Sequence, residues 1–424
     1  MKVLMVVRLF SGLEESVRSG TWQPRGAPTV YRLIEALDAR EELDLWLTAK
    51  EATMQAPDRD AVLTLAGLRT PVHFLAGEAR LPVWLGRLRW YLSEVRQIWR
   101  VWMQARTANA DLVYVDRGNL WIAGVLARWG RTPVIYRIMG FSDALRSSLT
   151  GSGLRHRINR WLLRSPFAAA ICTRDGSGGE QMLDLCMRPD VPKHHLVNGV
   201  DWELLHAPST SPPGPDGPAR VLLAGRLEAI KGCEEFMTAF LRARAQAPGA
   251  LHAVVLGEGE RRQAVEAMVD AAGARGDVSF LGSLPHREVA AAYRRADVYV
   301  TLNKMGSLSN TTLEALAAGC CIVLPASDPV THRDEITDAL LPSDAAARIP
   351  APDDVSALAR TLVELAADPA RRRHIAVHGV RAARAFIPTW NARIESEIAL
   401  LRRVAAVAPE VDVSRGQKST TRPT

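Results

Sequence analysis

Short apolar runs alternate with longer segments of helical periodicity along most of the chain. In the first half, the apolar runs predict strands at Val3–Val7, Leu43–Thr48, Leu112–Val115, Val134–Arg137 and Ala168–Cys172. In the second half, they predict strands at Arg220–Ala224, His252–Leu256, Val278–Leu281, Val298–Leu302 and Cys321–Leu324. Strands that alternate with helices are typical of βαβ units and parallel sheets. The pattern therefore predicts an α/β protein with doubly wound sheets.

One segment interrupts this alternation. Residues 207–218, APSTSPPGPDGP, hold five prolines and two glycines and cannot continue a helix or a central strand. We expect them to link an N-terminal domain, residues 1–206, to a C-terminal domain, residues 219–387. Two such domains leave a cleft at the carboxyl ends of their strands, where ligands bind. The polar tail, residues 406–424, is expected to be flexible.

Composition narrows the class of protein. The chain has 424 residues, of which 47% are hydrophobic and 23% charged, so it is neither wholly disordered nor fibrous. Its five cysteines include no C-x-x-C pair and its histidines form no visible constellation, which argues against a disulfide framework or a zinc site. The first apolar run ends at Arg8 and is too short for a signal peptide, and no run could span a bilayer. We expect a cytoplasmic location.

Positive charge is concentrated in residues 80–164, which hold 15 basic and 4 acidic residues and seven of the 11 tryptophans. Apolar residues there recur at helical spacing, and Arg89, Arg96 and Arg100 flank their stripe. Two interpretations stay open: peripheral contact with an anionic membrane, or a helix packed in the core with solvated arginines. A nucleic-acid partner is not expected, because no recognisable binding motif is present. The stripe consists of Leu85, Leu88, Leu92, Val95, Trp99 and Trp102.

The segment GRLEAIKG directly follows the apolar run VLLA. A glycine such as Gly225 lets the backbone approach a ligand, and Arg226 and Lys231 can neutralise a diphosphate leaving group. Stabilising that negative charge is what transfer from a diphosphate requires. The alternative is a loop with two solvated cations.

A second segment, GSLSNTTLEALAAG, begins at Gly306 and follows the run YVTLN. Small polar residues before an Ala/Leu helix would direct the free amides and dipole of its first turn into the cleft. Glu314 could accept hydrogen bonds from a ribose diol. It also stands at capping-box spacing from Thr311, which would give it a purely structural role.

Four segments of the second half resemble, in their order, the ordered blocks of the retaining glycosyltransferases of family 4. The segments are GRLEAIKG, VVLGEGERRQAVE, VSFLGSLPHREVAAAYRRADVYVTLN and SNTTLEALAAG. The resemblance is strongest over residues 220–325. It implies the GT-B architecture, with two Rossmann-like domains that face each other across a cleft. It further implies that Arg226 and Lys231 hold the donor diphosphate, that Glu314 binds the donor ribose, and that neither metal nor cofactor is needed. The family's last helix returns to the N-terminal domain, which assigns residues 388–405 there.

Two positions depart from the family pattern. Gly306 replaces the first glutamate of the E-x7-E motif, which contacts the donor sugar in the family. The amides of Ser307–Asn310 and the Asn310 side chain could contact sugar and phosphate instead. A histidine expected near the fourth strand of the N-terminal domain is also missing, and Arg137 and Asp143 are its candidate substitutes, with packing or capping as the simpler interpretation. The predicted donor-binding residues are Gly225, Ser307, Leu308, Ser309, Asn310 and Thr311.

The loop after the first strand contains Gly20 and Gly26, and Pro28 suits the first turn of a helix over Thr29–Leu37. This loop resembles the family's glycine-containing first loop, which faces the donor phosphate and the acceptor. An ordinary strand-to-helix loop is the alternative.

The resemblance implies an enzyme that transfers a sugar, with retention at the anomeric carbon, from a nucleotide-diphosphate donor to a glycan or polyprenyl-linked acceptor. Its expected role is bacterial surface or exopolysaccharide synthesis, with peripheral attachment to the inner face of the cytoplasmic membrane. Two rivals remain. Gly306 suggests a catalytically silent GT-B scaffold subunit, and a sugar-nucleotide epimerase would use the same architecture.

Overall fold

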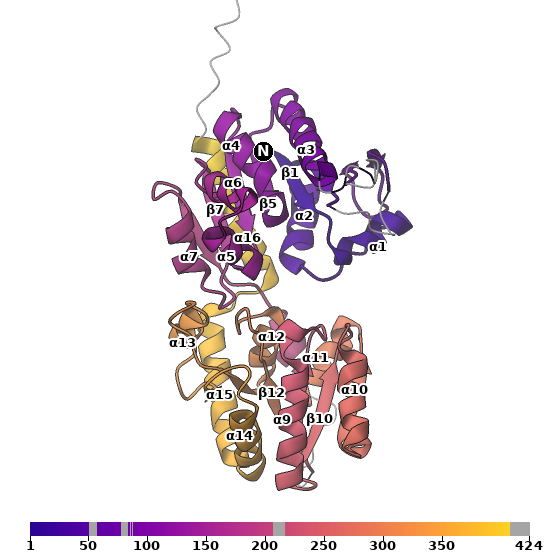
Figure 1. Ribbon diagram of the computed structural model, residues 1–424, viewed down its shortest axis with the longest axis vertical. Coiled ribbons are helices and arrows are strands. Elements are labelled where there is room, and N and C mark those ends of the chain that lie inside the picture. Colours follow the sequence, from indigo (N-terminus) through magenta and orange to yellow (C-terminus); the bar gives the residue numbers. More distant parts are fainter. Residues whose placement is uncertain (51–56, 78–83, 85, 87, 207–216, 408–424) are drawn as a thin grey trace, which may run out of the picture.

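The computed structural model describes residues 1–50, 57–77, 84, 86, 88–206 and 217–407. Two α/β domains lie one above the other along the long axis of the molecule (Figure 1). The N-terminal domain contains an eight-stranded sheet and the C-terminal domain a six-stranded sheet. Both sheets are predominantly parallel, so the predicted fold class is confirmed.

The N-terminal sheet has the strand order β3-β4-β2-β1-β5-β6-β7-β8, and only β3 runs antiparallel to its neighbour. All five strands predicted here are present, whereas β3, β4 and β8 were not predicted because they are short and partly polar. The strands are β1 (Lys2–Arg8), β2 (Glu42–Thr48), β3 (Ala61–Leu63), β4 (Val72–Leu75), β5 (Leu112–Asp116), β6 (Val134–Ile138), β7 (Ala169–Thr173) and β8 (Lys193–Leu196).

Helices cover both faces of this sheet. One face packs against α1 (Ser11–Ser19), α2 (Pro28–Arg40) and α16 (Trp390–Val407). The other packs against α3 (Leu88–Thr107), α4 (Leu120–Trp129), α5 (Asp143–Thr150), α6 (Leu154–Leu163) and α7 (Gly179–Cys186). The last helix of the described chain, α16, therefore lies with the first domain (Figure 1). Its Glu397 is fully buried and accepts a hydrogen bond from Tyr114 Oη at 2.6 Å.

The C-terminal sheet has the order β11-β10-β9-β12-β13-β14, so the direction of winding reverses between β9 and β12. All its strands are parallel, and all five predicted ones are present. The strands are β9 (Ala219–Ala224), β10 (Leu251–Leu256), β11 (Val278–Gly282), β12 (Val298–Val300), β13 (Cys321–Pro325) and β14 (Ala347–Ile349).

The C-terminal sheet is also covered on both faces. One face packs against α9 (Cys233–Gln246), α10 (Arg262–Ala271) and α14 (Val355–Ala367). The other packs against α8 (Trp202–His206), α11 (His286–Arg294), α12 (Asn310–Ala318), α13 (Glu335–Leu340) and α15 (Pro369–Phe386). Val200 and Leu205 belong to this second core, because α8 packs on α11 and α12. Residues 200–206 thus lie with the C-terminal domain, not with the N-terminal domain to which the sequence assigned them.

The predicted linker and tail lie mostly outside the described residues, which leave out 207–216 and 408–424.

The two domains touch through backbone atoms near the middle of the molecule. Leu308 N–H donates to Asp175 O at 3.0 Å, and Asp334 N–H donates to Gly176 O at 2.7 Å. Residues 175–177 follow β7 of the N-terminal domain and lie against residues 306–308 of the C-terminal domain. The carboxyl edges of the two sheets therefore approach each other closely on this side of the junction.

Helix α3 has an inverted amphipathic pattern. Its exposed side carries apolar residues that are each 41–58% exposed, whereas Glu94 and Gln97 are turned into the domain and buried. Of the two interpretations left open, packing in the core does not hold for most of the apolar stripe, although Trp102 does contact the core. Leu85 lies outside the described residues. The exposed apolar residues of α3 are Leu88, Leu92, Val95, Trp99 and Met103.

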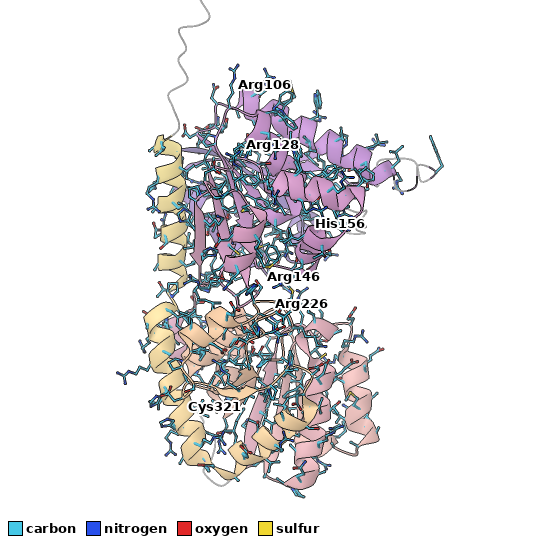
Figure 2. All side chains as sticks on the ribbon, turned by 60° about the vertical axis from the view of Figure 1, so that its left-hand side comes forward. Arg106, Arg128, Arg146, His156, Arg226 and Cys321 are labelled. Atoms are coloured by element: carbon cyan, nitrogen blue, oxygen red, sulfur yellow. The ribbon has the colours of Figure 1, made fainter. Side chains whose placement is uncertain are left out.

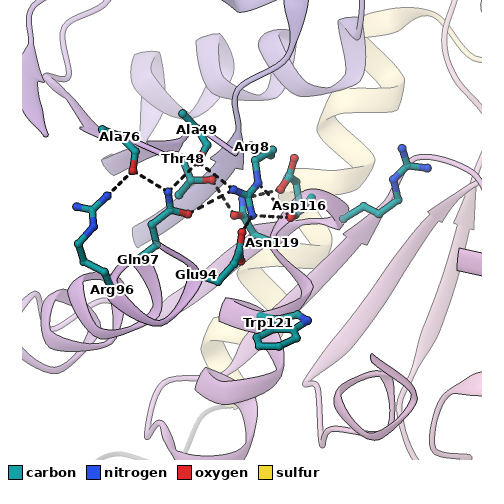
Figure 3. A network of polar contacts seen from close by, with 12 residues as sticks. Arg8, Thr48, Ala49, Ala76, Glu94, Arg96, Gln97, Asp116, Asn119 and Trp121 are labelled. Atoms are coloured by element: carbon teal, nitrogen blue, oxygen red, sulfur yellow. Dashed lines mark hydrogen bonds and ion pairs between the residues drawn. The ribbon is translucent and has the colours of Figure 1, made fainter. Parts of the chain in front are cut away.

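A polar network explains the inversion of α3 (Figure 3). Arg8, at the carboxyl end of β1, donates to Glu94 Oε1 at 2.9 Å and to Gly118 O at 2.9 Å. Gln97 Nε2 donates to Ala49 O at 2.8 Å. Because buried polar groups need such partners, the network holds the polar face of α3 inward. In the described chain, no helix is both long and apolar enough to cross a membrane.

Candidate active site

A pocket lies at the carboxyl ends of β9 and β12, where the winding of the C-terminal sheet reverses. Open α/β sheets bind ligands at this position. The predicted residues Gly225, Arg226, Lys231, Ser309 and Thr311 all line it. We call it the β9–β12 pocket; its other lining residues are Leu223, Ala224, Leu227, Tyr299, Val300, Thr301 and Asn303.

Gly232 of GRLEAIKG allows the loop to pack against the end of β12. A Cβ on Gly232 would lie 2.5 Å from Leu302 Cβ, so only glycine permits this approach. A Cβ on Gly225 would lie 3.9 Å from the Thr311 methyl group, which places the end of β9 beside the start of α12. The Lys304 amide donates to Ile230 O at 3.0 Å and fixes the loop to the segment after β12.

The two cations of the pocket differ in their environment. Lys231 is half-buried, and burial together with the charge of Arg226 lowers its pKa. Arg226 is 71% exposed and forms an ion pair with Glu228 at 2.8 Å. Figure 2 shows Arg226 on the edge of the C-terminal domain that faces the N-terminal domain. Since electrostatic interactions strengthen as water is excluded, Lys231 is the better placed of the two to stabilise an anion.

Helix α12 begins at the pocket. Ser309 is its N-cap, so Thr311 is the second helical residue and the predicted capping box from Thr311 to Glu314 does not form. Instead, Tyr299 Oη donates to Thr311 Oγ1 at 2.9 Å. The first amides of a helix have no intrahelical acceptor, so those of Asn310 and Thr311 can receive an anion.

Three residues predicted to bind the donor with backbone or side-chain groups already have partners in the protein. The Ser307 amide donates to Asp334 Oδ1 at 2.7 Å, and the Leu308 amide donates to Asp175 O. The side-chain oxygen of Asn310 accepts from Asn198 Nδ2 at 2.6 Å. The prediction that the Ser307 and Leu308 amides hold the donor is therefore not supported by their geometry.

Gly306 contacts the other domain directly. A Cβ at this position would lie 2.5 Å from Gly176 C, 2.6 Å from Asp175 O and 2.6 Å from Ser177 N. All three are backbone atoms of the N-terminal domain and cannot rotate away as a flexible side chain could. The space that the side chain of a glutamate would need is therefore filled by residues 175–177.

Glu314 lies one helical turn beyond Thr311, on the side of α12 that faces α11. Burial raises its pKa to about 7, although the nearby His286 and the Tyr293 hydroxyl act in the opposite direction. His286 Nε2 lies 2.9 Å from Asp201 Oδ2, and Arg32 of α2 lies 3.4 Å from the same oxygen. Glu314 thus adjoins a charged cluster that connects both domains.

The candidate residues of the N-terminal domain lie outside this pocket. Arg137 is 1% exposed, donates to Thr173 Oγ1 at 2.8 Å and lies 3.4 Å from Glu397. Its guanidinium is satisfied within the core, as the packing interpretation expects, so a cleft role for Arg137 is contradicted. Asp143 begins α5, but its side chain is not described.

The first loop is partly helical, since α1 occupies Ser11–Ser19. Gly20 ends α1 in the left-handed conformation, with φ of 70°. Gly26 also has a positive φ, 86°, and α2 starts at Pro28 as predicted. A positive φ favours glycine whether or not a ligand binds nearby. The two glycines are therefore explained by the backbone conformation, which favours the interpretation as an ordinary strand-to-helix loop.

Three buried polar residues near the pocket were not among the predicted site residues. Asn303 is buried and donates to Gly306 O at 2.7 Å, which shapes the loop before α12. Asp334 is fully buried and accepts from Ser307 and from Thr337 Oγ1 at 2.7 Å. Asp175 follows β7, and burial raises the pKa of its carboxyl. Asn303, at the end of the run YVTLN, and Asp175, three residues after the predicted strand Ala168–Cys172, lie close enough to predicted strands to have been candidates, whereas Asp334 does not.

Comparison with known proteins relates this architecture to sugar transferases. Residues 218–368 match the family model "Glycosyl transferases group 1". The glycogen synthase of Mycobacterium tuberculosis strain H37Rv is 27% identical over 279 residues, which cover 62% of this chain and 63% of the synthase. The chain therefore matches less than two thirds of that relative's length.

Solved structures resemble almost the whole chain. Sucrose-phosphate synthase from Thermosynechococcus elongatus superposes with a TM-score of 0.68 at 17% identity, covering 96% of this chain and 100% of that one. The trehalose 6-phosphate synthase of Burkholderia multivorans gives 0.67 at 16% identity, covering 96% and 100%. Anabaena HepE in complex with UDP gives 0.64 at 15% identity, covering 95% and 100%.

The fold shared with these structures is GT-B, which confirms the predicted architecture. The matched family model covers β9 to α14 and includes the whole β9–β12 pocket. Residues 218–368 therefore match a glycosyltransferase family model within a chain whose fold is GT-B.

Proposed function

We propose that this protein is a retaining, metal-independent glycosyltransferase that moves a sugar from a nucleotide-diphosphate donor to a glycan or polyprenyl-linked acceptor. The observation that carries the proposal is the β9–β12 pocket, where Lys231, Arg226 and the first turn of α12 converge at the reversal point of the sheet. Two cations and a helix N-terminus are suited to a diphosphate. A UDP-sugar is the first candidate donor, because HepE, which shares the fold, was solved with UDP and with UDP-glucose.

In the proposed reaction, the diphosphate lies between Lys231 and the amides at the start of α12, and the ribose diol is held by Glu314. The bond between the anomeric carbon and the diphosphate oxygen breaks, and the acceptor oxygen bonds to the same face of that carbon. The acceptor proton passes to the departing phosphate. Lys231 and Arg226 stabilise the charge that develops on the leaving group, which is where fixed charges accelerate a reaction most.

Two features of the N-terminal domain support a lipid-linked acceptor. The exposed apolar side of α3 lies next to α4, whose neighbour α6 also exposes Trp161 and Leu154. Arg128 stacks over Trp161, with its guanidinium carbon 3.9 Å from the ring centroid. Tryptophan, leucine and arginine on one surface suit the interface of an anionic membrane. We propose peripheral attachment at the cytoplasmic face and a role in bacterial surface or exopolysaccharide synthesis.

A thermal-shift panel of nucleoside mono- and diphosphates tests the proposed donor. We expect UDP to raise the melting temperature and UMP to raise it less, because the diphosphate contributes most of the contacts. A ligand present at 100 times its Kd stabilises the folded state by about 2.7 kcal/mol, which is readily measured. Because the pKa of Glu314 is about 7, the UDP shift should be larger at pH 8, where the carboxylate is charged, than at pH 6.

Glu314→Gln is the control for this pH dependence, since UDP itself also loses a proton near pH 6. The variant should retain only the part of the pH effect that belongs to the nucleotide. If no nucleoside diphosphate stabilises the protein, the proposed function is wrong. If UDP binds but UDP-sugars release no nucleotide in the presence of acceptor lipids, the chain is instead the silent scaffold that Gly306 suggested.

Flotation with liposomes tests the membrane surface. We expect the protein to float with vesicles that contain phosphatidylglycerol at low salt and to be released as salt rises. Leu92→Glu combined with Trp99→Glu should weaken binding about tenfold or more, because two exposed apolar side chains no longer enter the membrane. The matched control is Val330→Glu, which alters an apolar residue that is 87% exposed in the C-terminal domain. Equal flotation of all three proteins would contradict the assignment of α3.

A further inference from the structure

Three metal-binding side chains meet on the C-terminal domain. His374 and His378 lie four residues apart on α15, and their rings stack with centroids 4.2 Å apart. Asp344 lies in the segment between α13 and β14, and its Oδ2 is 2.5 Å from His378 Nδ1. Each of the three residues offers one ligand atom, and these atoms all lie within 4.8 Å of one another.

The backbone of α15 brings this cluster together. Gly379, next to His378, lies so close to the segment after α13 that a Cβ there would be 3.1 Å from Ala345 O. A larger residue would push the helix away from Asp344. The helix also packs against α12 and β13, so its position does not depend on the exposed cluster. The three side chains are therefore presented on a rigid support, which a metal site requires.

The cluster is separate from the β9–β12 pocket, since none of its residues lines that pocket. Asp344 and His374 are exposed and His378 is half-buried, so an ion can enter from solvent. Two histidines at i and i+4 point the same way on a helix and are a common way to bind zinc. A carboxylate beside them completes a set of three ligands, which leaves room for water.

We propose that Asp344, His374 and His378 bind one divalent transition-metal ion of the zinc type. Imidazole nitrogen favours zinc, nickel and copper over magnesium and calcium, which prefer oxygen ligands alone. The bound ion would tie the segment between α13 and β14 to α15 and stabilise the C-terminal domain. It takes no part in sugar transfer, so the site is independent of the proposed function.

The charged residues around the three ligands affect the expected affinity for the metal ion. Arg371 and Arg381 lie one helical turn before His374 and after His378, respectively, and their positive charge opposes a second cation. With three ligands in a largely solvated position, we expect micromolar affinity for zinc.

Calorimetric titration of the full chain, free of any affinity tag, with zinc chloride tests the proposal. We expect one zinc ion per chain, a rise in melting temperature, and loss of both in the double variant His374→Ala, His378→Ala. Asp344→Asn should weaken zinc binding by about tenfold or more. The matched control is His73→Ala. His73 also lies near a carboxylate, 3.8 Å from Asp44, but among the described residues it belongs to no group of three potential metal ligands.

Cobalt substitution gives a second readout. Co²⁺ bound by nitrogen and oxygen ligands of the protein absorbs visible light more strongly than aqueous Co²⁺ does. The wild type and the His73→Ala variant should show these bands, and the double variant should not. Wild-type protein that binds no zinc, or a double variant that binds zinc as tightly as the wild type, would overturn the proposal. Nucleotide binding should be the same in every variant, so a failed metal site leaves the proposed function untouched.

Discussion

Replacing Lys231 by alanine is expected to lower the rate of sugar transfer by about 100-fold or more at saturating donor. Lys231 is the more enclosed cation of the β9–β12 pocket, whose lining also includes Ser309 and Thr311 at the start of α12. Its charge acts most strongly when the diphosphate departs, because negative charge on the leaving group is then greatest. The loss should therefore appear mainly in kcat. The measurement is transfer, or donor hydrolysis, with a radiolabelled nucleotide sugar.

Arg226→Ala should have a smaller effect than Lys231→Ala, because Arg226 is largely exposed and water already screens its charge. Lys304→Ala is the matched control. Lys304 is a cation of the same domain, but it forms an ion pair with Glu235 at 2.5 Å and does not line the pocket. A Lys231→Ala enzyme with a kcat within twofold of the wild type would contradict the proposed role.

The position of the β9–β12 pocket was largely predictable from the sequence. GRLEAIKG and the start of α12 each follow an apolar strand, and the carboxyl ends of parallel strands share one edge of the sheet. Residues that follow β9 and β12 were therefore expected at the same edge of the sheet, and the structure places Gly225, Lys231, Ser309 and Thr311 around one pocket. The alternation of elements predicts that shared edge, whereas the pairing of β9 with β12 is known only from the structure.

What the sequence did not predict depends on contacts between distant segments. Asp334 sits in a segment without apolar periodicity, yet it holds Ser307 through a contact 27 residues away in sequence. The helical pattern of α3 was recognised, but its apolar face was open to two interpretations. Contacts with distant segments, such as that of Glu94 with Arg8, 86 residues away, decide which face turns inward. A local sequence pattern cannot predict such contacts between distant segments.

Introducing a glutamate at Gly306 is expected to destabilise the protein and to lower its activity. A Cβ alone would lie within 2.6 Å of three backbone atoms of residues 175–177, so either the domains separate or the loop moves. Overpacking of this kind costs about 1–3 kcal/mol. We expect Gly306→Ala and, more strongly, Gly306→Glu to lower the melting temperature, to increase the radius of gyration in small-angle X-ray scattering, and to reduce transfer activity.

Gly276→Ala separates this effect from the general cost of replacing a glycine, because a Cβ at Gly276 would meet no atom within 4 Å. Its melting temperature and scattering should match the wild type. The opposite result for Gly306→Glu is equally informative. A variant with unchanged stability and greater transfer activity would mean that residues 175–177 move away from Gly306 during the reaction. Because the Leu308 amide bonds to Asp175 O and the Asp334 amide to Gly176 O, such a movement would have to break two hydrogen bonds between the domains. The close contact at Gly306 would then belong to one state of an opening and closing cycle.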